Sequence, residues 1–371
     1  MSDKSVRHEA TKKSFLKESA WLRFSSPLVS TLLRASAADS EMLELGSAAR
    51  PGQPEGLLFP IVAHYLLLKA PDPSLARFFP SLTSQPDPVE EAFSVFREFC
   101  LDRREEFTDL LSRRTVNTNL VERSSCILPT LAYVGRVTHE PLTLVEICCS
   151  SGMSLQFDQY HYDYGPVGQL GADHSPVHLN CKVIGSSRPP IEAIPQVAER
   201  VGVDLVTIDP LDPLERLWME AAVYPEWLEE RGHLRGALAL RATHPIRMIM
   251  GDALEVLPSL LEGLPGSPCV LHSYCLAQWT EAGKRELDDV LRRASRNRDI
   301  HRIGLDSPER ESPGTIRGRL GKLAAAGVPL RQKSLPSYIE HTWYVKHGAR
   351  TRVLGQADGF GGWIDWQGVE S

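Results

Sequence analysis

The sequence lacks an apolar stretch long enough to cross a membrane. The apolar segment at residues 56–70 is shorter than the roughly 20 residues that a spanning helix needs, so it predicts a buried helix. The first twenty residues carry too many charges for the apolar core of a signal peptide. We therefore expect no membrane partner and a cytoplasmic location.

Paired cysteine motifs and an excess of positive charge are missing as well. The seven cysteines are odd in number and include no C-x-x-C pair. This pattern argues against a disulfide framework and against a zinc site, so no metal is expected, and it favours a reducing compartment. The formal net charge of −6 gives no overall attraction for phosphate backbones. Nucleic acid is therefore not an expected partner.

What the sequence does contain is two regions of different periodicity. Residues 14–136 carry amphipathic helical patterns separated by Pro, Gly and Ser breaks, and the pattern becomes strand-like at Pro141. We predict a helical N-terminal cap over residues 1–138. An α/β domain is predicted over residues 139–371, with a Gly-, Pro- and Ser-rich insertion near residues 165–190.

Strand-like and helical segments alternate in the second region. The predicted strands are residues 142–147, 204–209, 247–250, 268–274 and 300–305, followed by a terminal pair at 338–345 and 350–354. A short helix is predicted at residues 194–201, before the second strand. Five strand-then-helix units of this kind predict a doubly wound, mostly parallel α/β sheet with helices on both faces.

The junction after the first predicted strand is the first candidate ligand site. Glu146 lies at the end of the strand, and Ser150 and Gly152 lie in the loop of small residues that follows. Backbone N–H groups at such a junction, together with a carboxylate, can hold a cofactor. Only Gly152 is present where a nucleotide-binding loop usually carries two or three glycines. An ordinary turn between a strand and a helix is the alternative.

Polar side chains also close the later predicted strands. Asp209, Asp252 and His272 each fall at a carboxyl end, where open α/β sheets bind their ligands. Asp209 is predicted to accept from ribose hydroxyls and Asp252 from an adenine amino group. An ion pair or a helix N-cap is the alternative for each carboxylate. Asp209 lies 57 residues after Gly152, where about 20 is usual, so the insertion must absorb the difference or another carboxylate must bind the ribose.

Several phrases spread over nearly the whole chain are specific when taken together. They lie at residues 116–123, 146–152, 157–165, 204–212, 216–218, 251–253 and 272–273. They resemble the bacterial family catalogued as domain of unknown function 2332, which in turn resembles class I S-adenosylmethionine-dependent methyltransferases. The resemblance implies a seven-stranded sheet whose last strand is antiparallel, and S-adenosylmethionine as the cofactor.

The chain departs from the pattern of that family at three positions. Cys148 stands where the family has the first glycine of its loop, Leu120 where it has Glu, and Phe360 where it tends to have His. The first departure places a Cβ where a backbone should come closest to the cofactor. The other two change residues that the family could use in acid–base chemistry.

Methyl transfer to a small molecule is the first functional hypothesis that the resemblance implies. The expected cofactor contacts are Glu146, Cys148, Ser150, Gly152, Asp209, Asp252 and Ser273. The expected catalytic residues are His272, as a base, and Tyr160. The expected substrate contacts are Asn119, Arg123, His161, Tyr162 and Tyr274. A structural histidine, and helix capping by Asn119 and Arg123, are the alternatives. Alignment of the reactants is the main task, and a base is needed only if the acceptor must lose a proton.

Two other hypotheses belong to different classes of protein. A methyltransferase-like scaffold that has lost transfer could serve as a binding or assembly protein, and Cys148 is its support. Alternatively, Cys148 or Cys149 could act as a nucleophile at a helix N-terminus, where a thiolate is stabilised. The sequence leaves the methyl acceptor and the oligomeric state open.

Overall fold

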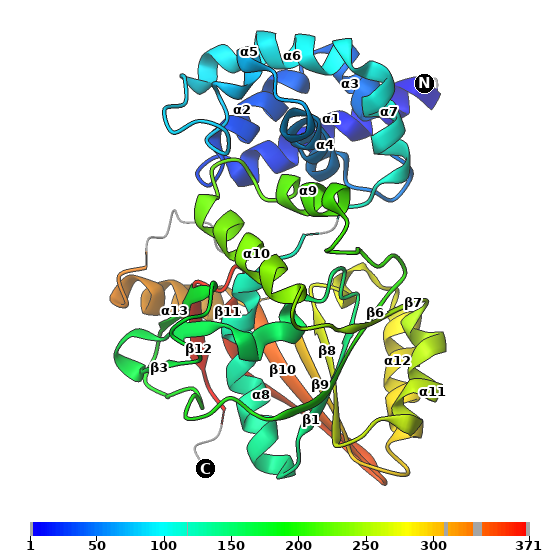
Figure 1. Cartoon of the computed structure of the whole chain (residues 1–371), viewed down its shortest axis with the longest axis vertical. Coiled ribbons are helices and arrows are strands. Elements are labelled where there is room, and N and C mark those ends of the chain that lie inside the picture. Colours follow the sequence, from blue (N-terminus) through cyan, green and yellow to red (C-terminus); the bar gives the residue numbers. More distant parts are fainter. Residues whose placement is uncertain (1–2, 117, 308–310, 329–335, 369–371) are drawn as a thin grey trace. The chain divides into compact units, whose positions relative to one another are not determined.

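Two units divide the chain in the computed structural model, which describes residues 3–116, 118–307, 311–328 and 336–368 (Figure 1). The described residues up to 119 and residues 212–232 form a helical unit, and the other described residues form an α/β unit. The chain passes from the helical unit to the α/β unit within helix α10 (Leu228–Arg241). Helix α8 (Ser124–Thr138), which we assigned to the cap, is part of the α/β unit.

The helical unit is built around α4 (Glu55–Lys69), which is buried along nearly its whole length because its sequence is apolar on all sides. Its other α-helices are α1 (Asp3–Leu22), α2 (Pro27–Ser36), α3 (Ser40–Gly46), α5 (Pro73–Ala76), α6 (Ala92–Asp102), α7 (Arg104–Arg113) and α9 (Pro213–Ala221). Phe59 of α4 packs against Phe15 and Phe107, with ring centroids 5.0 and 5.3 Å apart. Among the described residues, no helix is long and apolar enough to span a membrane.

The α/β unit contains a nine-stranded sheet in the order β5-β12-β11-β10-β9-β8-β1-β6-β7. The five strands β1 (Leu142–Ile147), β6 (Val197–Asp204), β7 (Arg247–Met250), β8 (Ser267–Ser273) and β9 (Ile300–Asp306) are parallel. The antiparallel strands β10 (Pro336–Val345), β11 (Gly348–Asp358) and β12 (Trp363–Trp366) follow, and β5 (Lys182–Val183) pairs with β12.

The predicted seven-stranded, doubly wound sheet is therefore wrong. The sheet is larger because the C-terminal segment supplies a third antiparallel strand, β12, beyond the predicted pair, and the insertion supplies β5. These two additional strands have only four and two residues, too few to show a period in the sequence. The insertion also forms a small sheet of β2 (His161–Asp163), β3 (Gln169–Leu170) and β4 (His178–Asn180).

The second parallel strand lies earlier in the chain than predicted. The segment predicted as a helix at residues 194–201 contains most of β6, and the strand ends at Asp204 rather than Asp209. In this strand only Val201, Gly202 and Val203 are buried. Its first half includes Glu199 and Arg200, so β6 lacks the continuous apolar run that is typical of a buried parallel strand. The predicted helix after the first loop is a 3-10 helix, η3 (Met153–Gln159).

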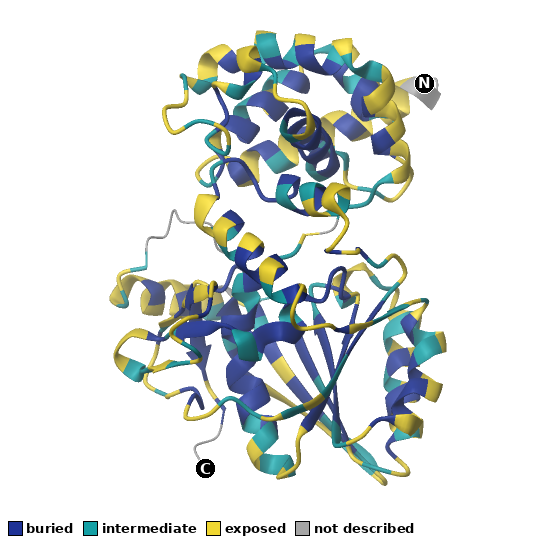
Figure 2. Cartoon of the chain, viewed as in Figure 1, coloured by how far each residue is buried: buried dark blue, intermediate teal, exposed yellow. Residues whose placement is uncertain are grey.

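Helices cover the parallel strands from two sides. Helices α11 (Ala253–Gly263) and α12 (Glu281–Ala294) pack on the face that carries Val145, Val201 and Val270. Helix α8 contacts β9, β10 and β11 (Figure 1). Helix α13 (Pro313–Ala325) completes the unit. Burial follows this layering, because the central strands β1, β8 and β9 are mostly buried while the outer faces of α11 and α12 are exposed (Figure 2).

One glycine in the sheet is required by a close approach. Gly304 of β9 lies opposite His272 of β8 in the parallel register. A Cβ added to Gly304 would lie 2.5 Å from Cε1 and 2.8 Å from Nε2 of the His272 ring. The ring is therefore held flat over the neighbouring strand only because residue 304 has no side chain.

We expect Gly304→Ala to lower the free energy of unfolding by about 1–3 kcal/mol, because the added methyl group collides with a buried imidazole. His272→Ala should remove most of this penalty in a double-mutant cycle. Unfolding in urea measures the effect. The control is Gly348→Ala in β11, where the added Cβ meets nothing within 4 Å. Equal losses in the two alanine variants would contradict the close approach.

Candidate functional site

The topological switch point of the parallel strands lies between β1 and β8. From β1 the chain proceeds outward to β6 and β7 and then returns to β8 on the other side of β1. Connections therefore leave the carboxyl ends of β1 and β8 in opposite directions, which is where open α/β sheets form a ligand crevice. The loop after β1 and the residues that follow β8 border this point.

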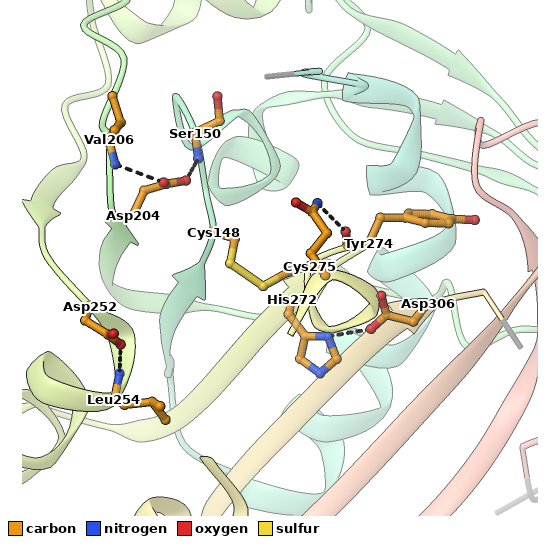
Figure 3. The surroundings of a disulfide bond; sticks show 11 residues. Cys148, Ser150, Asp204, Val206, Asp252, Leu254, His272, Tyr274, Cys275 and Asp306 are labelled. Carbon is orange, nitrogen blue, oxygen red and sulfur yellow. Dashed lines mark hydrogen bonds and ion pairs between the residues drawn. A yellow bond between two sulfur atoms is a disulfide. The ribbon is translucent and has the colours of Figure 1, made fainter. Parts of the chain in front are cut away.

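The loop after β1 is held against β6 by a carboxylate. Asp204, the last residue of β6, accepts from the backbone N–H of Ser150 at 2.7 Å and from that of Val206 at 3.1 Å (Figure 3). Asp209 lies beyond the strand, is exposed, and accepts from the N–H of Leu211 within a turn. The carboxylate at the end of the second strand is therefore Asp204, and the sequence reasoning missed it because the strand was placed too late.

The same loop is joined to the end of β8 by a disulfide. Cys148 is bonded to Cys275, with 6.0 Å between the Cα atoms, and the bond spans the point between β1 and β8 (Figure 3). Cys148 is exposed, whereas Cys275 is only 3% exposed. One disulfide is not a framework, but it is a crosslink that the cysteine pattern did not predict. The pairing joins residues 127 positions apart, so no short spacing could have revealed it.

The hypothesis of a cysteine nucleophile receives no support from this arrangement. The sulfur of Cys148 is held in the disulfide. Burial raises the pKa of the Cys149 thiol, and the nearby carboxylates of Glu146 and Asp204 raise it further. A nucleophile requires a thiolate, which these surroundings disfavour.

Glu146 lies at the end of β1 and is buried, with 6% of its surface exposed. Burial raises the pKa of its carboxyl group to about 8, although a hydrogen bond with Ser154 and the charge of Arg123 act in the opposite direction. Its Oε2 has no hydrogen-bond partner among the described residues. Glu146 therefore offers one unpartnered oxygen beside the loop.

Arg123 contacts two other residues that the sequence predicts for the site, Ser273 and Tyr274. Its Nη1 donates to Ser273 Oγ at 3.3 Å, and its guanidinium lies 4.5 Å from the centre of the Tyr274 ring. Burial lowers the pKa of Arg123, while the charge of Glu146 is among the groups that raise it. Burial also raises the pKa of Tyr274 to about 12, so this phenol is neutral near pH 7.

The turn between β11 and β12 completes the surroundings of Arg123. Arg123 Nε donates to the carbonyl oxygen of Gly359 at 3.0 Å. A Cβ on Gly359 would overlap the hydroxyl of Tyr274, at 2.0 Å, so only glycine fits there. The sequence reasoning missed this turn. The run Gly359-Phe-Gly-Gly362 indicates a turn, but only its Phe360 entered the sequence prediction.

His272 contacts a carboxylate at the end of β8. Its Nδ1 lies 2.8 Å from Oδ2 of Asp306, the last residue of β9 (Figure 3). The ring is 5% exposed, and Nε2 has no hydrogen-bond partner among the described residues. Sequence reasoning missed Asp306, although it directly follows the predicted strand at residues 300–305. The role of His272 as a base stays a prediction.

The remaining predicted residues lie in different surroundings. Tyr160 and Tyr162 are fully buried, and their hydroxyls donate to the carbonyl oxygens of Met153 and Phe157 at 2.7 and 2.6 Å. These bonds give both tyrosines a structural role. His161 packs its ring 4.8 Å from that of His178 within the small sheet. Asn119 belongs to the helical unit.

Asp252 and Gly152 occupy the two positions at which local backbone geometry dominates. Asp252 caps α11 by accepting from the N–H of Leu254 at 2.8 Å (Figure 3). Gly152 has φ of 72°, in the left-handed region that favours glycine.

Within the described part of the chain, no group of three or more His, Cys, Asp or Glu side chains is arranged to hold a metal ion.

The fold and the site define an α/β protein with a polar, disulfide-bridged edge at the switch point of a mixed nine-stranded sheet. A family model described as "uncharacterized protein conserved in bacteria (DUF2332)" matches residues 12–366. The chain therefore belongs to this family, as its sequence phrases predicted. Comparison with curated proteins and with solved structures gives no match.

The raised pKa of Glu146 predicts a pH dependence of stability. The folded chain retains a proton on Glu146 up to about pH 8, whereas the unfolded chain releases it at the ordinary glutamate pKa of 4.5. Its contribution to stability is therefore present at low pH and is lost as the pH rises toward 8. Gln resembles the neutral carboxyl group, so Glu146→Gln should not show this loss.

We compare the free energy of unfolding of Glu146→Gln with that of the wild type at each pH. The difference should shift in favour of the variant by on the order of 1–2 kcal/mol between about pH 6 and pH 8. Urea unfolding at both pH values measures it. Glu262→Gln, at an exposed position of α11, is the matched control and should follow the wild type. If the curves for Glu146→Gln and the wild type stay parallel, the buried carboxyl group does not titrate in this range.

Proposed function

We propose that the carboxyl edge of the parallel strands binds S-adenosylmethionine and that the protein transfers its methyl group to a small molecule. The observation that carries the proposal is a row of carboxylates at or just beyond three neighbouring strand ends: Glu146 in β1, Asp204 in β6 and Asp252 after β7. The β1 strand in this row borders the switch point. Such a row offers acceptors at successive distances along a ligand that carries an amine and hydroxyl groups.

Exposed apolar side chains lie next to Asp204 and Asp252. Leu205 and Val206 follow Asp204, and Met250, which pairs with Asp204 in the sheet, precedes Asp252. Leu205 is 69% and Met250 71% exposed, which is unusual for large apolar residues beside polar groups at a strand end. A flat heteroaromatic ring such as adenine would cover this surface while its amino group donates to a carboxylate.

The residues present fit the cofactor at two further points. The unpartnered Oε2 of Glu146 is suited to accept from an ammonium group, because such an atom is costly to bury without a donor. Asp204 takes the place of Asp209 as the acceptor for ribose hydroxyls. Asp252 uses Oδ1 for its helix cap, and a carboxylate accepts more than one hydrogen bond, so capping and ligand binding are compatible.

In this proposal the cofactor supplies an electrophilic methyl group on a positively charged sulfur, and the chain supplies alignment. The carboxylate of Asp204 favours a cation near the loop after β1, and Glu146 adds to this attraction when the bound cation draws off its proton. Arg123, Ser273 and Tyr274 form a hydrogen-bonded group at the end of β8 that could orient a polar acceptor. The His272–Asp306 pair would accept a proton where the acceptor must lose one.

A second candidate function is ligand binding without transfer. The observation that favours it is the disulfide across the switch point, because a crosslink at the loop limits how closely a cofactor can approach. Both candidates predict a ligand at the same edge. They differ in turnover, since only the first predicts conversion of S-adenosylmethionine to S-adenosylhomocysteine in the presence of an acceptor.

We expect calorimetric titration of the fully reduced protein with S-adenosylhomocysteine to give saturable heat. Asp252→Asn should weaken the affinity by about tenfold or more, because it removes a charged acceptor, while Asn retains the helix cap. Exposed Glu262→Gln on the same helix is the control and should bind as the wild type does. Absence of heat, together with absence of thermal stabilisation by S-adenosylmethionine and S-adenosylhomocysteine, would refute the proposal.

A further inference from the structure

The disulfide joins two segments that are otherwise attached to different strands. On one side, the loop after β1 is fastened to β6, because Cys149 N donates to the carbonyl oxygen of Val203 and Ser150 N donates to Asp204. On the other side, Tyr274 N donates to the carbonyl oxygen of Leu305 in β9. The Cys148–Cys275 bond is the covalent link between these two halves of the sheet edge, and it crosses the switch point (Figure 3).

The residues at both ends of this link adopt a conformation that L-residues rarely take. Cys148 and Ser150 have φ of 53°, and Tyr274, which precedes Cys275, has φ of 54°. Left-handed conformations at non-glycine residues persist only where the surroundings hold them in place, and they cluster at ligand sites and switch regions. The crosslink is part of what holds these three residues.

The two bonded cysteines differ in how exposed they are. Cys148 is exposed, whereas Cys275 is almost fully buried at the start of the 3-10 helix η5 (Leu276–Gln278). An attacking thiolate from solution therefore reaches Cys148 first. Exposed disulfides are the ones that exchange readily with thiols, whereas buried structural disulfides resist exchange.

We propose that Cys148–Cys275 is a reversible thiol–disulfide exchange site that fastens the loop after β1 across the carboxyl edge of the sheet at the switch point. A thiolate of a small thiol, such as glutathione, attacks Cys148 Sγ and breaks the bond, so that Cys275 leaves as a thiolate and takes up a proton. A second thiolate then attacks the mixed disulfide and releases Cys148 as a thiol. Two thiols are thereby oxidised to one disulfide, and the pair in the protein gains two electrons and two protons.

Reduction has a structural consequence for this edge. Once the bond is broken, the loop after β1 remains attached to β6, but the left-handed residues Cys148 and Ser150 lose their link to the β8 side. The loop can then adopt other backbone conformations and no longer bridges the ends of β1 and β8, which stay paired. Where this edge binds the ligand of the proposed function, on which this consequence rests, the reduced form is the one that binds.

The first experiment tests the asymmetry of the two sulfur atoms with a matched pair of variants. Cys275→Ser leaves Cys148 free and exposed, and Cys148→Ser leaves Cys275 free and buried. On incubation of the native proteins with oxidised glutathione, we expect Cys148 in the first variant to form the mixed disulfide at least tenfold faster than Cys275 in the second. Mass spectrometry of the intact proteins and of their peptides measures both rates.

Equal rates would overturn the proposed order of attack. The wild-type protein provides a second measurement that does not depend on either variant folding. Native wild type is equilibrated in graded mixtures of reduced and oxidised glutathione and then alkylated. We expect Cys148 and Cys275 to become alkylated together in one transition, while buried Cys100 and Cys269 stay protected. A bond that forms under no mixture, or that breaks only when the protein unfolds, would overturn the exchange site.

The second experiment tests whether the bond controls the loop. Hydrogen exchange is compared between oxidised and reduced wild type, with Cys269→Ala as a control for removal of a cysteine in β8 that takes no part in the bond. We expect faster exchange of the amides at residues 148–152 and 274–278 after reduction, with unchanged exchange in β6 and in α11. Unchanged exchange at both segments would contradict the fastening role.

A third measurement separates this proposal from the proposed function. S-adenosylhomocysteine is titrated into the oxidised and the reduced protein, and we expect at least tenfold tighter binding to the reduced form. Equal binding to both forms retains the proposed function and overturns control of this edge by the bond. Binding to neither form overturns the proposed function alone, because the exchange chemistry and the loop release are decided by the glutathione and hydrogen-exchange measurements.

Discussion

The parallel pairing of β1 with β6 on one side and β8 on the other is the constraint on which the rest of the α/β unit depends. It places the carboxyl ends of three strands at one edge, and with them Glu146, Asp204 and Ser273. Polar groups brought together at a partly buried edge must find partners or shift their pKa. Arg123 partners Ser273 and Gly359, while Glu146 keeps one unpartnered oxygen and a raised pKa.

Arg123 connects parts of the chain that are far apart in the sequence. Its guanidinium contacts the end of β8 and the turn between β11 and β12. The hydroxyl of Ser125 also donates a hydrogen bond to this turn, at the carbonyl oxygen of Gly361. The start of α8, the end of β8 and the C-terminal strands are thereby tied together at one point. The antiparallel extension of the sheet is thus connected to the edge that carries the candidate site, because its β11–β12 turn supplies a carbonyl oxygen to Arg123.

The sequence predicted the parts of this site that depend on local pattern. The end of β8 was predicted because its apolar run is clear, and Arg123 contacts Ser273 and Tyr274 there. The binding roles of these three residues stay predictions. The sequence could not predict the end of β6, because polar residues in its exposed half resemble a helix. The Cys148–Cys275 bond depends on tertiary proximity alone, since local sequence contains no information about a partner 127 residues away.

The shortage of glycines in the loop after β1 has a structural counterpart in the crosslink. Nucleotide-binding loops use glycine because left-handed backbone is costly for L-residues, by about 1–2 kcal/mol each. Here Cys148 and Ser150 take that conformation without being glycine, and the disulfide and the Asp204 carboxylate hold them. A crosslink that closes so long a stretch stabilises a folded chain by about 4–5 kcal/mol in the chain-entropy description, which exceeds the cost of two such residues. The conformation that glycine would provide permanently is therefore provided here by a bond that thiols can break.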